Sequence, residues 1–305
     1  MLFIGVTTAQ SAAHQFFPAW SAALGIGASS RLEGVDVPLG APRATYRAIG
    51  RRLRDDPEVA GALITSHKIA TYEAAADLFD ATDALATLCG EVGCVSRASG
   101  RVIGHALDPI TSIAALDRLA PVAHWEAFPQ ARVACLGAGG AGVAIGVGLA
   151  QRVALAPGPA GVVVIDRDTS RVDHAQAIMK RVGAPDGWAS GVASGGDASH
   201  TDAIVTSLPP GSVVINATGM GKDVPGSPLS ESVRFPEGGV AWDLNYRGDR
   251  PFLGQAAAQA STRGLSVADG WDYFAISWAL HVARVFGVNE DANALGRAVA
   301  ATTRQ

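Results

Sequence analysis

The chain has 305 residues and a formal net charge of −4 at pH 7. This length allows two α/β domains, because a single hydrophobic core usually stops growing near roughly 250 to 300 residues. Arginines are scattered among aspartates and glutamates, so no basic face is offered to the phosphates of a nucleic acid. We therefore expect a small-molecule ligand and no nucleic-acid partner.

The cysteines and the N-terminal segment indicate the compartment. Cys89, Cys94 and Cys135 are odd in number, and the first two are too far apart for the usual half-site of a structural zinc. We predict buried free thiols and no metal site. The apolar run at residues 1–6 follows no basic segment and is far shorter than a membrane span. The sequence predicts a cytoplasmic protein with no membrane partner, as a monomer or homodimer.

The first third of the sequence alternates short β-rich runs with helical stretches. This pattern is typical of strands joined by crossover helices in a largely parallel sheet. The expected strands are 2–6, 32–37, 60–65, 93–98 and 102–107, and the expected helices are 12–24, 42–54 and 69–78. A further helix should begin at Pro109, with Asp108 before it capping the free amides.

From residue 132 the pattern becomes that of a buried parallel sheet. A compact apolar strand at 133–136 is followed by a glycine turn and by a helical run that reaches residue 153. Three more buried strands are expected at 162–165, 213–215 and 240–244, each followed by a polar or glycine-rich turn. Together these elements predict a doubly wound sheet. The aromatic helical segment 273–286 should leave it and pack on the first part of the chain.

The glycine turn carries a nucleotide-binding pattern. Gly137, Gly139 and Gly142 have the spacing of the dinucleotide fingerprint, with Gly140 between them. Glycine there permits a tight turn, close approach of the backbone to a pyrophosphate and close contact of helix and strand. The N-terminus of the helix then faces the phosphates. A purely structural glycine turn is the alternative, because a Gly- and Ala-rich sequence produces such spacings by chance.

The acid that ends the next strand favours one cofactor. Asp166 lies where a carboxylate accepts hydrogen bonds from the adenine ribose hydroxyls and repels a 2′-phosphate, so we expect NAD. Arg167 complicates the choice, since its guanidinium can stack on adenine or accept the phosphate of NADP. The alternative for Asp166 is an acid that only begins a surface turn.

These patterns predict a two-domain α/β protein. We expect a smaller α/β substrate domain at residues 1–110 and a Rossmann dinucleotide-binding domain at 111–268. The C-terminal helices at 269–305 should return to the substrate domain and complete it. A cleft between two such domains would receive cofactor and substrate.

Two residues of the first domain have the chemistry for acid–base catalysis. Lys68 is expected in the first turn of a helix, where the dipole disfavours a cation by a few tenths to about 1 kcal/mol. A lysine held against the dipole exchanges its proton more readily with a substrate oxygen. Asp108 follows a strand and would open into the crevice where α/β proteins bind ligands. The alternatives are a solvated surface lysine and an ordinary helix cap.

At these residues the sequence resembles the shikimate/quinate dehydrogenase family over nearly its whole length. Residues 64–68 resemble the segment that carries the family's catalytic lysine, and residues 104–108 resemble its Gly-x-Asn-Thr-Asp segment. Further matches are the strand end near the nicotinamide at 215–218, the Asp-x-x-Tyr region at 242–246 with 251–253, and 269–270 before the final helix. Asp166 with residues 169–171 is similar to the NAD-preferring quinate dehydrogenase branch.

The resemblance implies roles for these residues. Lys68 would be the acid/base and Asp108 its partner and substrate anchor, with coupled protonation. Asn216, Ala217, Thr218 and Gly270 would contribute to cofactor binding. Tyr246 would contact the substrate.

The resemblance fails along the substrate wall. The family's Ser-x-Ser pair, which fixes the substrate carboxylate, aligns with Ser11 and Ala13, so half of this clamp is missing. Other polar positions of the family fall on Ala62, Ile64, Ser96, Ala106, Leu107 and Ser277. His67 and His105 are neighbours of the catalytic pair and could supply substitute hydrogen bonds to a substrate, or they could be structural. The substrate-binding candidates are therefore Ser11, His67, His105, Tyr246 and Ser277.

These observations predict an oxidoreductase. The chain would transfer a hydride between NAD, or NADP, and a small polar, carboxylated hydroxy compound that is not necessarily shikimate. Two alternatives remain open. One is a non-catalytic dinucleotide-binding regulator, against which the retention of Lys68 and Asp108 argues. The other is an enzyme like methylene-tetrahydrofolate dehydrogenase, which the Asp-x-x-Tyr segment fits less well.

Overall fold

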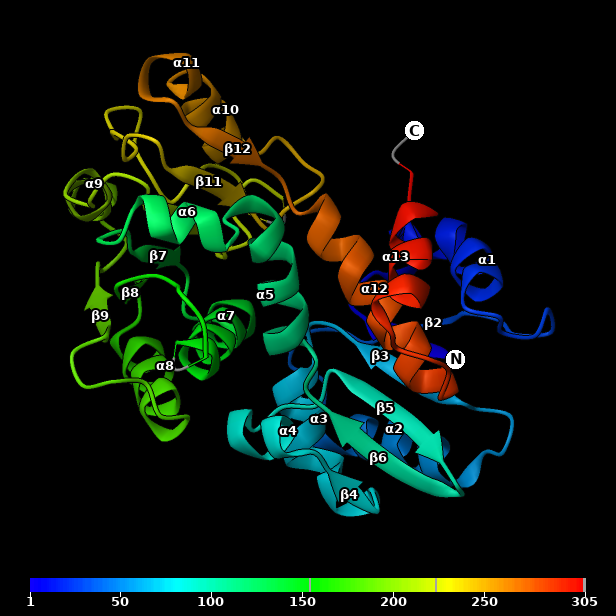
Figure 1. Ribbon diagram of the computed structural model, residues 1–305. Coiled ribbons are helices and arrows are strands. Elements are labelled where there is room, and N and C mark those ends of the chain that lie inside the picture. Colours follow the sequence, from blue (N-terminus) through cyan, green and yellow to red (C-terminus); the bar gives the residue numbers. More distant parts are fainter. Residues whose placement is uncertain (154, 223, 304–305) are drawn as a thin grey trace. The chain divides into compact units, whose positions relative to one another are not determined.

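A computed structural model describes residues 1–153, 155–222 and 224–303. The chain divides into two compact units (Figure 1). The first unit comprises Met1–Thr111 and the chain from Ala275 onward, and the second comprises Ser112–Phe274. Each unit contains one six-stranded sheet. The chain passes between the units within two helices, α5 (Asp108–Leu119) and α12 (Trp271–Phe286).

The sheet of the first unit has the strand order β2-β1-β3-β5-β6-β4. Its strands are β1 (Leu2–Gly5), β2 (Glu33–Asp36), β3 (Gly61–Ile64), β4 (Ala81–Thr82), β5 (Cys94–Ala98) and β6 (Arg101–His105). Its helices are α1 (Ala13–Ala23), α2 (Arg43–Asp55), α3 (Lys68–Ala75), α4 (Ala84–Cys89) and α13 (Ala292–Ala300), with 3₁₀ turns η1 (Thr8–Gln10) and η2 (Ala76–Leu78). Strands β1 and β3 are buried throughout because both faces are covered.

The sheet of the first unit is mixed: five strands run in one direction, in agreement with the prediction of a largely parallel sheet, and β5 runs against them. Strand β5 runs antiparallel to both β3 and β6. Only Ser99 and Gly100 separate β5 from β6, with φ of 51° and 77°. Two residues with positive φ close an antiparallel hairpin, whereas a parallel crossover needs a dozen residues or more. Because β3 and β6 both flank β5 in the opposite direction, they run parallel to each other.

The C-terminal helix α12 packs on the first unit, as predicted for the segment 273–286. The ring of Trp278 stacks on Trp20 of α1 with centroids 5.3 Å apart and meets the edge of Phe3 of β1 at 4.9 Å. The indole of Trp20 is fully buried and donates to Thr302 at 2.7 Å. Large aromatic surfaces bury more apolar area than any other side chains, so these rings anchor the end of the chain.

The second unit is an all-parallel, doubly wound sheet in the order β12-β11-β10-β7-β8-β9. Its strands are β7 (Val133–Leu136), β8 (Val162–Asp166), β9 (Ala189–Ala193), β10 (Val213–Asn216), β11 (Val240–Asp243) and β12 (Ser266–Ala268). Its helices, besides α5 and the start of α12, are α6 (Val122–Ala127), α7 (Gly140–Arg152), α8 (Thr169–Arg181), α9 (Ala198–Thr206), α10 (Pro251–Ala257) and α11 (Ala260–Arg263). The predicted fold class is confirmed: the chain contains a Rossmann unit and a smaller α/β unit that the C-terminal helices complete.

The order of strands locates the ligand crevice of the second unit. From β7 the chain winds outward through β8 and β9 and then returns to β10 on the other side. The sheet therefore changes direction between β7 and β10, and ligands of open α/β sheets bind at the carboxyl ends of strands at such a point.

Cys89, Cys94 and Cys135 are buried thiols outside any disulfide, as predicted, and burial raises the pKa of the Cys135 thiol to about 12. Among the described residues, no helix has the length and apolar character needed to cross a bilayer. The same residues contain no cluster of three metal-ligating side chains.

Candidate active site

The glycine loop of the second unit has the backbone that its sequence predicts. Gly137 follows β7 with a φ of 106°, and a Cβ there would lie 2.8 Å from the Ala217 carbonyl oxygen. A Cβ on Gly142 would collide with the carbonyl of Gly137. Nothing lies within 4 Å of a Cβ built on Gly139, the residue before α7. The first and third glycines are thus required by the protein's own packing, while the second leaves the start of the helix open to a ligand.

Asp166 ties this loop to the neighbouring strand. Its two carboxylate oxygens accept hydrogen bonds from the backbone amides of Ala138 at 2.8 Å and Asp168 at 3.0 Å. A carboxylate has about four acceptor positions, so Asp166 retains capacity for two hydroxyl groups of a ribose. Asp166 therefore does more than begin a surface turn, because its side chain is hydrogen-bonded to the glycine loop.

A pocket of about 360 Å³ opens beside Asp166. Its lining includes Gly137, Gly139, Arg167, Arg171, Ala217 and Thr218. Both arginines are exposed, and the Arg171 guanidinium is 4.0 Å from the Asp168 carboxylate. Ser194, which lies between β9 and α9, also lines the pocket. Neither of these two elements was predicted from the sequence. The pocket combines one carboxylate, two cations and an open helix N-terminus, which suits an elongated ligand with ribose and phosphate groups.

Asn216 shapes the loop after β10 from a fully buried position. Its amide nitrogen donates to Asp243 and to the Met220 carbonyl, both at 3.2 Å, and its oxygen accepts from the Thr218 hydroxyl at 2.6 Å. One carboxylate oxygen of Asp243 is buried without a hydrogen bond in the described chain, and burial raises the pKa of this carboxyl. Ala217 and Thr218, rather than Asn216, reach the pocket.

Gly270 and Tyr246 lie near the start of α12. A Cβ on Gly270 would collide with the Leu244 carbonyl, so the loop after β11 can approach the helix only at a glycine. The ring of Tyr246 packs against Phe274 and Trp271, with centroids 4.7 Å and 5.7 Å apart. Both residues therefore belong to the second unit, on its strand-end side.

Lys68 and Asp108 come together in the first unit. Lys68 is the first residue of α3, just after β3, and Asp108 is the first residue of α5, just after β6. Because β3 and β6 are parallel, their carboxyl ends meet at one edge of the sheet. The Lys68 ammonium donates to the Asp108 carboxylate, and their side chains are only 19% and 7% exposed. This geometry is inconsistent with a solvated surface lysine.

The surroundings of Lys68 favour proton exchange. Burial lowers the pKa of the Lys68 ammonium, and the nearby Glu91 carboxylate opposes that shift.

The expected helix start at Pro109 is one residue late, since α5 begins at Asp108 itself. The carboxylate of Asp108 is bound to Lys68, so its partner in this structure is the ammonium rather than the helix amides that we expected it to cap.

His67 is buried, and both of its ring nitrogens have protein partners. Its Nε2 lies 2.9 Å from the carbonyl oxygen of Val37, which can only accept, so Nε2 carries the proton. Its Nδ1 then accepts from the Tyr46 hydroxyl at 3.1 Å. The ring anchors the first turn of α3, which carries Lys68. A hydrogen bond to substrate would require one of these partners to be exchanged.

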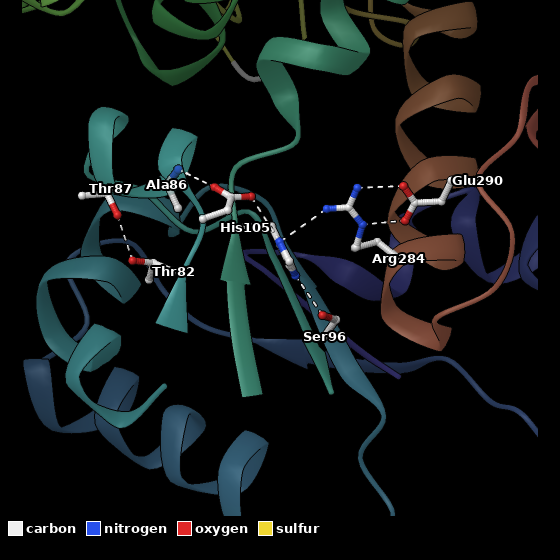
Figure 2. Close-up of polar contacts among 8 residues, drawn as sticks. Thr82, Ala86, Thr87, Ser96, His105, Arg284 and Glu290 are labelled. Carbon is white, nitrogen blue, oxygen red and sulfur yellow. Dashed lines mark hydrogen bonds and ion pairs between the residues drawn. The ribbon is translucent and has the colours of Figure 1, made fainter. Parts of the chain in front are cut away.

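His105 lies in a polar network, which Figure 2 shows. Its Nε2 is 2.8 Å from the Ser96 hydroxyl, and its Nδ1 is 3.1 Å from the Asp83 carboxylate. Arg284 of α12 approaches Nδ1 at 3.4 Å and is held by Glu290 through contacts of 2.5 and 2.7 Å. Burial raises the pKa of the Asp83 carboxyl, but hydrogen bonds from His105 and from backbone amides outweigh it, so the pKa is lowered. This network joins β6, three residues before Asp108, to α4, β5 and α12.

The remaining candidates are only half-buried. The Ser11 hydroxyl accepts from the Ala13 amide at 3.2 Å, and the Ser277 hydroxyl lies 3.4 Å from Nδ1 of His281. By contrast, the apolar residues aligned with polar family positions have no exposed surface: Ala13, Ala62, Ile64, Ala106 and Leu107.

Two titratable residues of this site, Glu91 and His281, were not predicted from the sequence. Glu91 and His281 are 4% and 1% exposed, and both interact electrostatically with Lys68. Burial lowers the pKa of His281 to about 3, so the ring is neutral near pH 7 and its Nδ1 donates to the Ser277 carbonyl at 2.7 Å. Neither residue lies in a recognisable motif. Their only sequence signal is a polar residue within an apolar stretch.

The fold of this chain is shared with solved structures of known enzymes. The chain matches solved structures of shikimate and quinate dehydrogenases over nearly its full length, so it has the fold of these enzymes. No protein-family model and no curated protein sequence matches it significantly.

Three solved structures illustrate the likeness. Quinate dehydrogenase from Corynebacterium glutamicum, in complex with NAD, has a TM-score of 0.70 at 23% identity, covering 98% of this chain and 96% of its own. Shikimate 5-dehydrogenase from Thermus thermophilus, in complex with NADP(H) and shikimate, has a TM-score of 0.67 at 24% identity, covering 99% and 98%. The ligand-free 5-ketofructose reductase of a Gluconobacter strain has a TM-score of 0.64 at 21% identity, covering 98% and 96%.

Proposed function

We propose that this chain is a nicotinamide-dependent oxidoreductase that transfers a hydride between NAD and a small polar, carboxylated hydroxy compound. The observation that carries the proposal is the pairing of Lys68 with Asp108 at the carboxyl ends of two parallel strands, in a largely buried setting. An isolated buried ion pair contributes little to stability, so its retention at a strand-end crevice favours a chemical role.

In this reaction the protein handles the proton. The substrate hydroxyl would give its proton to Nζ of Lys68 as the bond from carbon to hydrogen breaks, and Asp108 would orient both groups. When bound, the nicotinamide ring accepts the hydride. In the reverse direction the Lys68 ammonium protonates the carbonyl oxygen that is being reduced. The lowered pKa of Lys68 serves both directions, because proton transfer is most effective when the pKa lies near the working pH.

The residues of the second unit fit a dinucleotide. The open N-terminus of α7, with Gly139 before it, suits the pyrophosphate, and Asp166 suits the adenine ribose. Ala217 and Thr218 line the same pocket at the end of β10. Backbone atoms of the protein already occupy the positions that a Cβ on Gly137 or Gly142 would take, so the glycine loop presents only backbone at these two residues.

A substrate screen tests the proposed function. Purified protein would be incubated with NAD and a panel of hydroxy acids and polyols, and reduced nicotinamide would be followed by absorbance. Polyols belong in the panel because a 5-ketofructose reductase shares this fold. We expect turnover with at least one carboxylated hydroxy compound and turnover at least about 10²-fold lower in a Lys68→Ala sample. Tight NAD binding without turnover of any compound, in either direction, would favour the regulatory protein instead.

The cofactor preference is expected to favour NAD over NADP by at least about tenfold in Kd, which corresponds to about 1.4 kcal/mol. The Asp166 carboxylate should repel a 2′-phosphate, and Arg167 and Arg171 offset this only in part because both are exposed to solvent. Asp166→Asn keeps an acceptor for the Ala138 amide and removes the charge, so it should narrow the preference. Calorimetric titration of both cofactors measures this, with Asp173→Asn on the exposed face of α8 as the control. Tighter binding of NADP to the unaltered protein would show that the arginines govern the pocket.

A further inference from the structure

The first unit buries a carboxylic acid for which the proposed reaction has no use. Glu91 follows α4, which ends at Gly90 in the left-handed conformation with a φ of 64°. Its side chain is 4% exposed, and its backbone amide donates to the Ala86 carbonyl at 3.2 Å. Within the described chain its carboxylate makes no hydrogen bond. Burying a carboxyl in this way is costly, so the position calls for a compensating charge.

That charge is the ammonium of Lys68. The segment after Glu91 is hydrogen-bonded to the start of α3: the Val92 amide donates to the Lys68 backbone carbonyl at 3.2 Å. The Lys68 side chain then passes Gly93 so closely that a Cβ there would lie 3.4 Å from its Cε and 3.7 Å from its Nζ. Gly93 is itself bound to the end of β6, because its amide donates to the backbone carbonyl of His105 at 2.9 Å. The residues around Glu91 therefore line the path of the Lys68 side chain.

We propose that Glu91 is a positioning residue of the acid–base pair: with Asp108 it places the Lys68 ammonium between two buried carboxylates and retains the proton on Nζ. Two anions then share one cation. Lys68 would remain charged to a higher pH than its burial alone allows, and it would release its proton only when a bound substrate changes this balance.

In the part of the chain that the structure describes, few titratable groups face Lys68. They are Asp108, which binds the ammonium directly, Glu91, which attracts it, and His281 of α12, whose ring is neutral near pH 7 because burial lowers its pKa to about 3. Burial raises the pKa of the Glu91 carboxyl, and attraction by the Lys68 ammonium offsets part of that rise. Removing the negative charge of Glu91 therefore acts on Lys68 in one direction: the pKa of the ammonium falls.

The composition of the chain makes this directly measurable. The sequence contains only three lysines, Lys68, Lys180 and Lys222. Protein labelled with carbon-13 at lysine Cε should give three resolved NMR signals, and Lys68→Met assigns one of them. In Glu91→Gln, which keeps the shape of the side chain, we expect the midpoint of the Lys68 signal to fall by at least about one pH unit. The midpoints of Lys180 and Lys222 should not move.

Two further variants control the experiment. Glu73→Gln removes an exposed acid from α3, the helix that begins with Lys68, and should leave the midpoint unchanged. Glu91→Asp keeps the charge, so its midpoint should stay closer to that of the unaltered protein. If Glu91→Gln does not fold, Glu91→Met, which is uncharged and of similar length, replaces it as the test. A Lys68 midpoint that is unchanged or raised in Glu91→Gln, or that falls equally in Glu91→Asp, would overturn the inference.

The kinetic consequence depends on the proposed function, whereas the titration does not. If neutral Lys68 accepts the hydroxyl proton, kcat/KM for oxidation rises with pH through the pKa of Lys68. Glu91→Gln should then move this limb to lower pH by the same amount as the NMR midpoint. A shifted midpoint in a protein that turns over no substrate keeps the role of Glu91 and removes the oxidoreductase. Turnover of a substrate with an unshifted Lys68 midpoint keeps the oxidoreductase and removes the proposed role of Glu91.

Discussion

Lys68→Ala is expected to lower turnover by roughly 10²- to 10⁴-fold, the usual contribution of a positioned acid–base group, without loss of NAD binding. Lys68 is the proposed proton acceptor, and its ammonium is held by Asp108 in a largely buried position. The glycine loop and its pocket belong to the second unit, whereas Lys68 belongs to the first. Steady-state kinetics combined with calorimetric titration of NAD separate the two effects.

Asp108→Asn should give a loss of similar size because it removes the partner of the ammonium. Breaking one side of a buried ion pair also costs roughly 3 to 5 kcal/mol of stability, so thermal unfolding must accompany the kinetics. Lys180→Ala, on the exposed face of α8, is the matched control for Lys68→Ala and should retain full turnover. Full turnover in a folded Lys68→Ala protein would remove this residue from the catalytic role.

Shikimate and quinate are expected to be poor substrates, with kcat/KM at least about 10³-fold below that of the true substrate. Four aligned positions, Ala13, Ala62, Ile64 and Ala106, have no group that pairs with a carboxylate or a ring hydroxyl, and all four are fully buried. Each unpaired polar group in a desolvated complex costs about 1 to 3 kcal/mol. Two such losses in the middle of this range reach the stated factor. Assays of both acids at saturating NAD measure it.

A single substitution tests the physical reason for this expectation. Ala13→Ser adds one hydroxyl beside Ser11 and restores the Ser-x-Ser arrangement that resembles the family's carboxylate clamp. It should raise kcat/KM for shikimate by about tenfold, the worth of one good hydrogen bond, while Ala22→Ser at the exposed end of α1 changes nothing. Efficient use of shikimate by the unaltered protein would show that another set of residues binds it.

The second unit was the more predictable half. Its strand β7 was predicted at its observed bounds, and β8, β10 and β11 were predicted to within a residue. Short apolar runs between glycine or polar turns are a local signal, because the central strands of a parallel sheet are buried on both faces. Edge strands and surface helices such as β9 and α9 lack that signal, and they were not predicted.

The first unit was less predictable because its sheet depends on one turn. The hairpin between β5 and β6 requires positive φ at Ser99, a conformation that serine rarely adopts. The second turn residue is Gly100, but the first is a serine rather than the asparagine, aspartate or glycine that usually marks a two-residue hairpin, so the strands were predicted and the antiparallel direction was not. This direction is what brings the ends of β3 and β6, and so Lys68 and Asp108, to the same edge.

The sequence by itself determined the glycine loop, the buried strands and the identity of the proposed catalytic pair, because these depend on backbone requirements and motifs within a few neighbouring residues. Only the tertiary structure decided which polar groups remain for a ligand. His67 is bound by a carbonyl 30 residues away and His105 is approached by an arginine 179 residues away, so no local pattern shows that both rings are already engaged. Glu91 joins Lys68 for the same reason: charges act through space, and the distance between them is set by the fold.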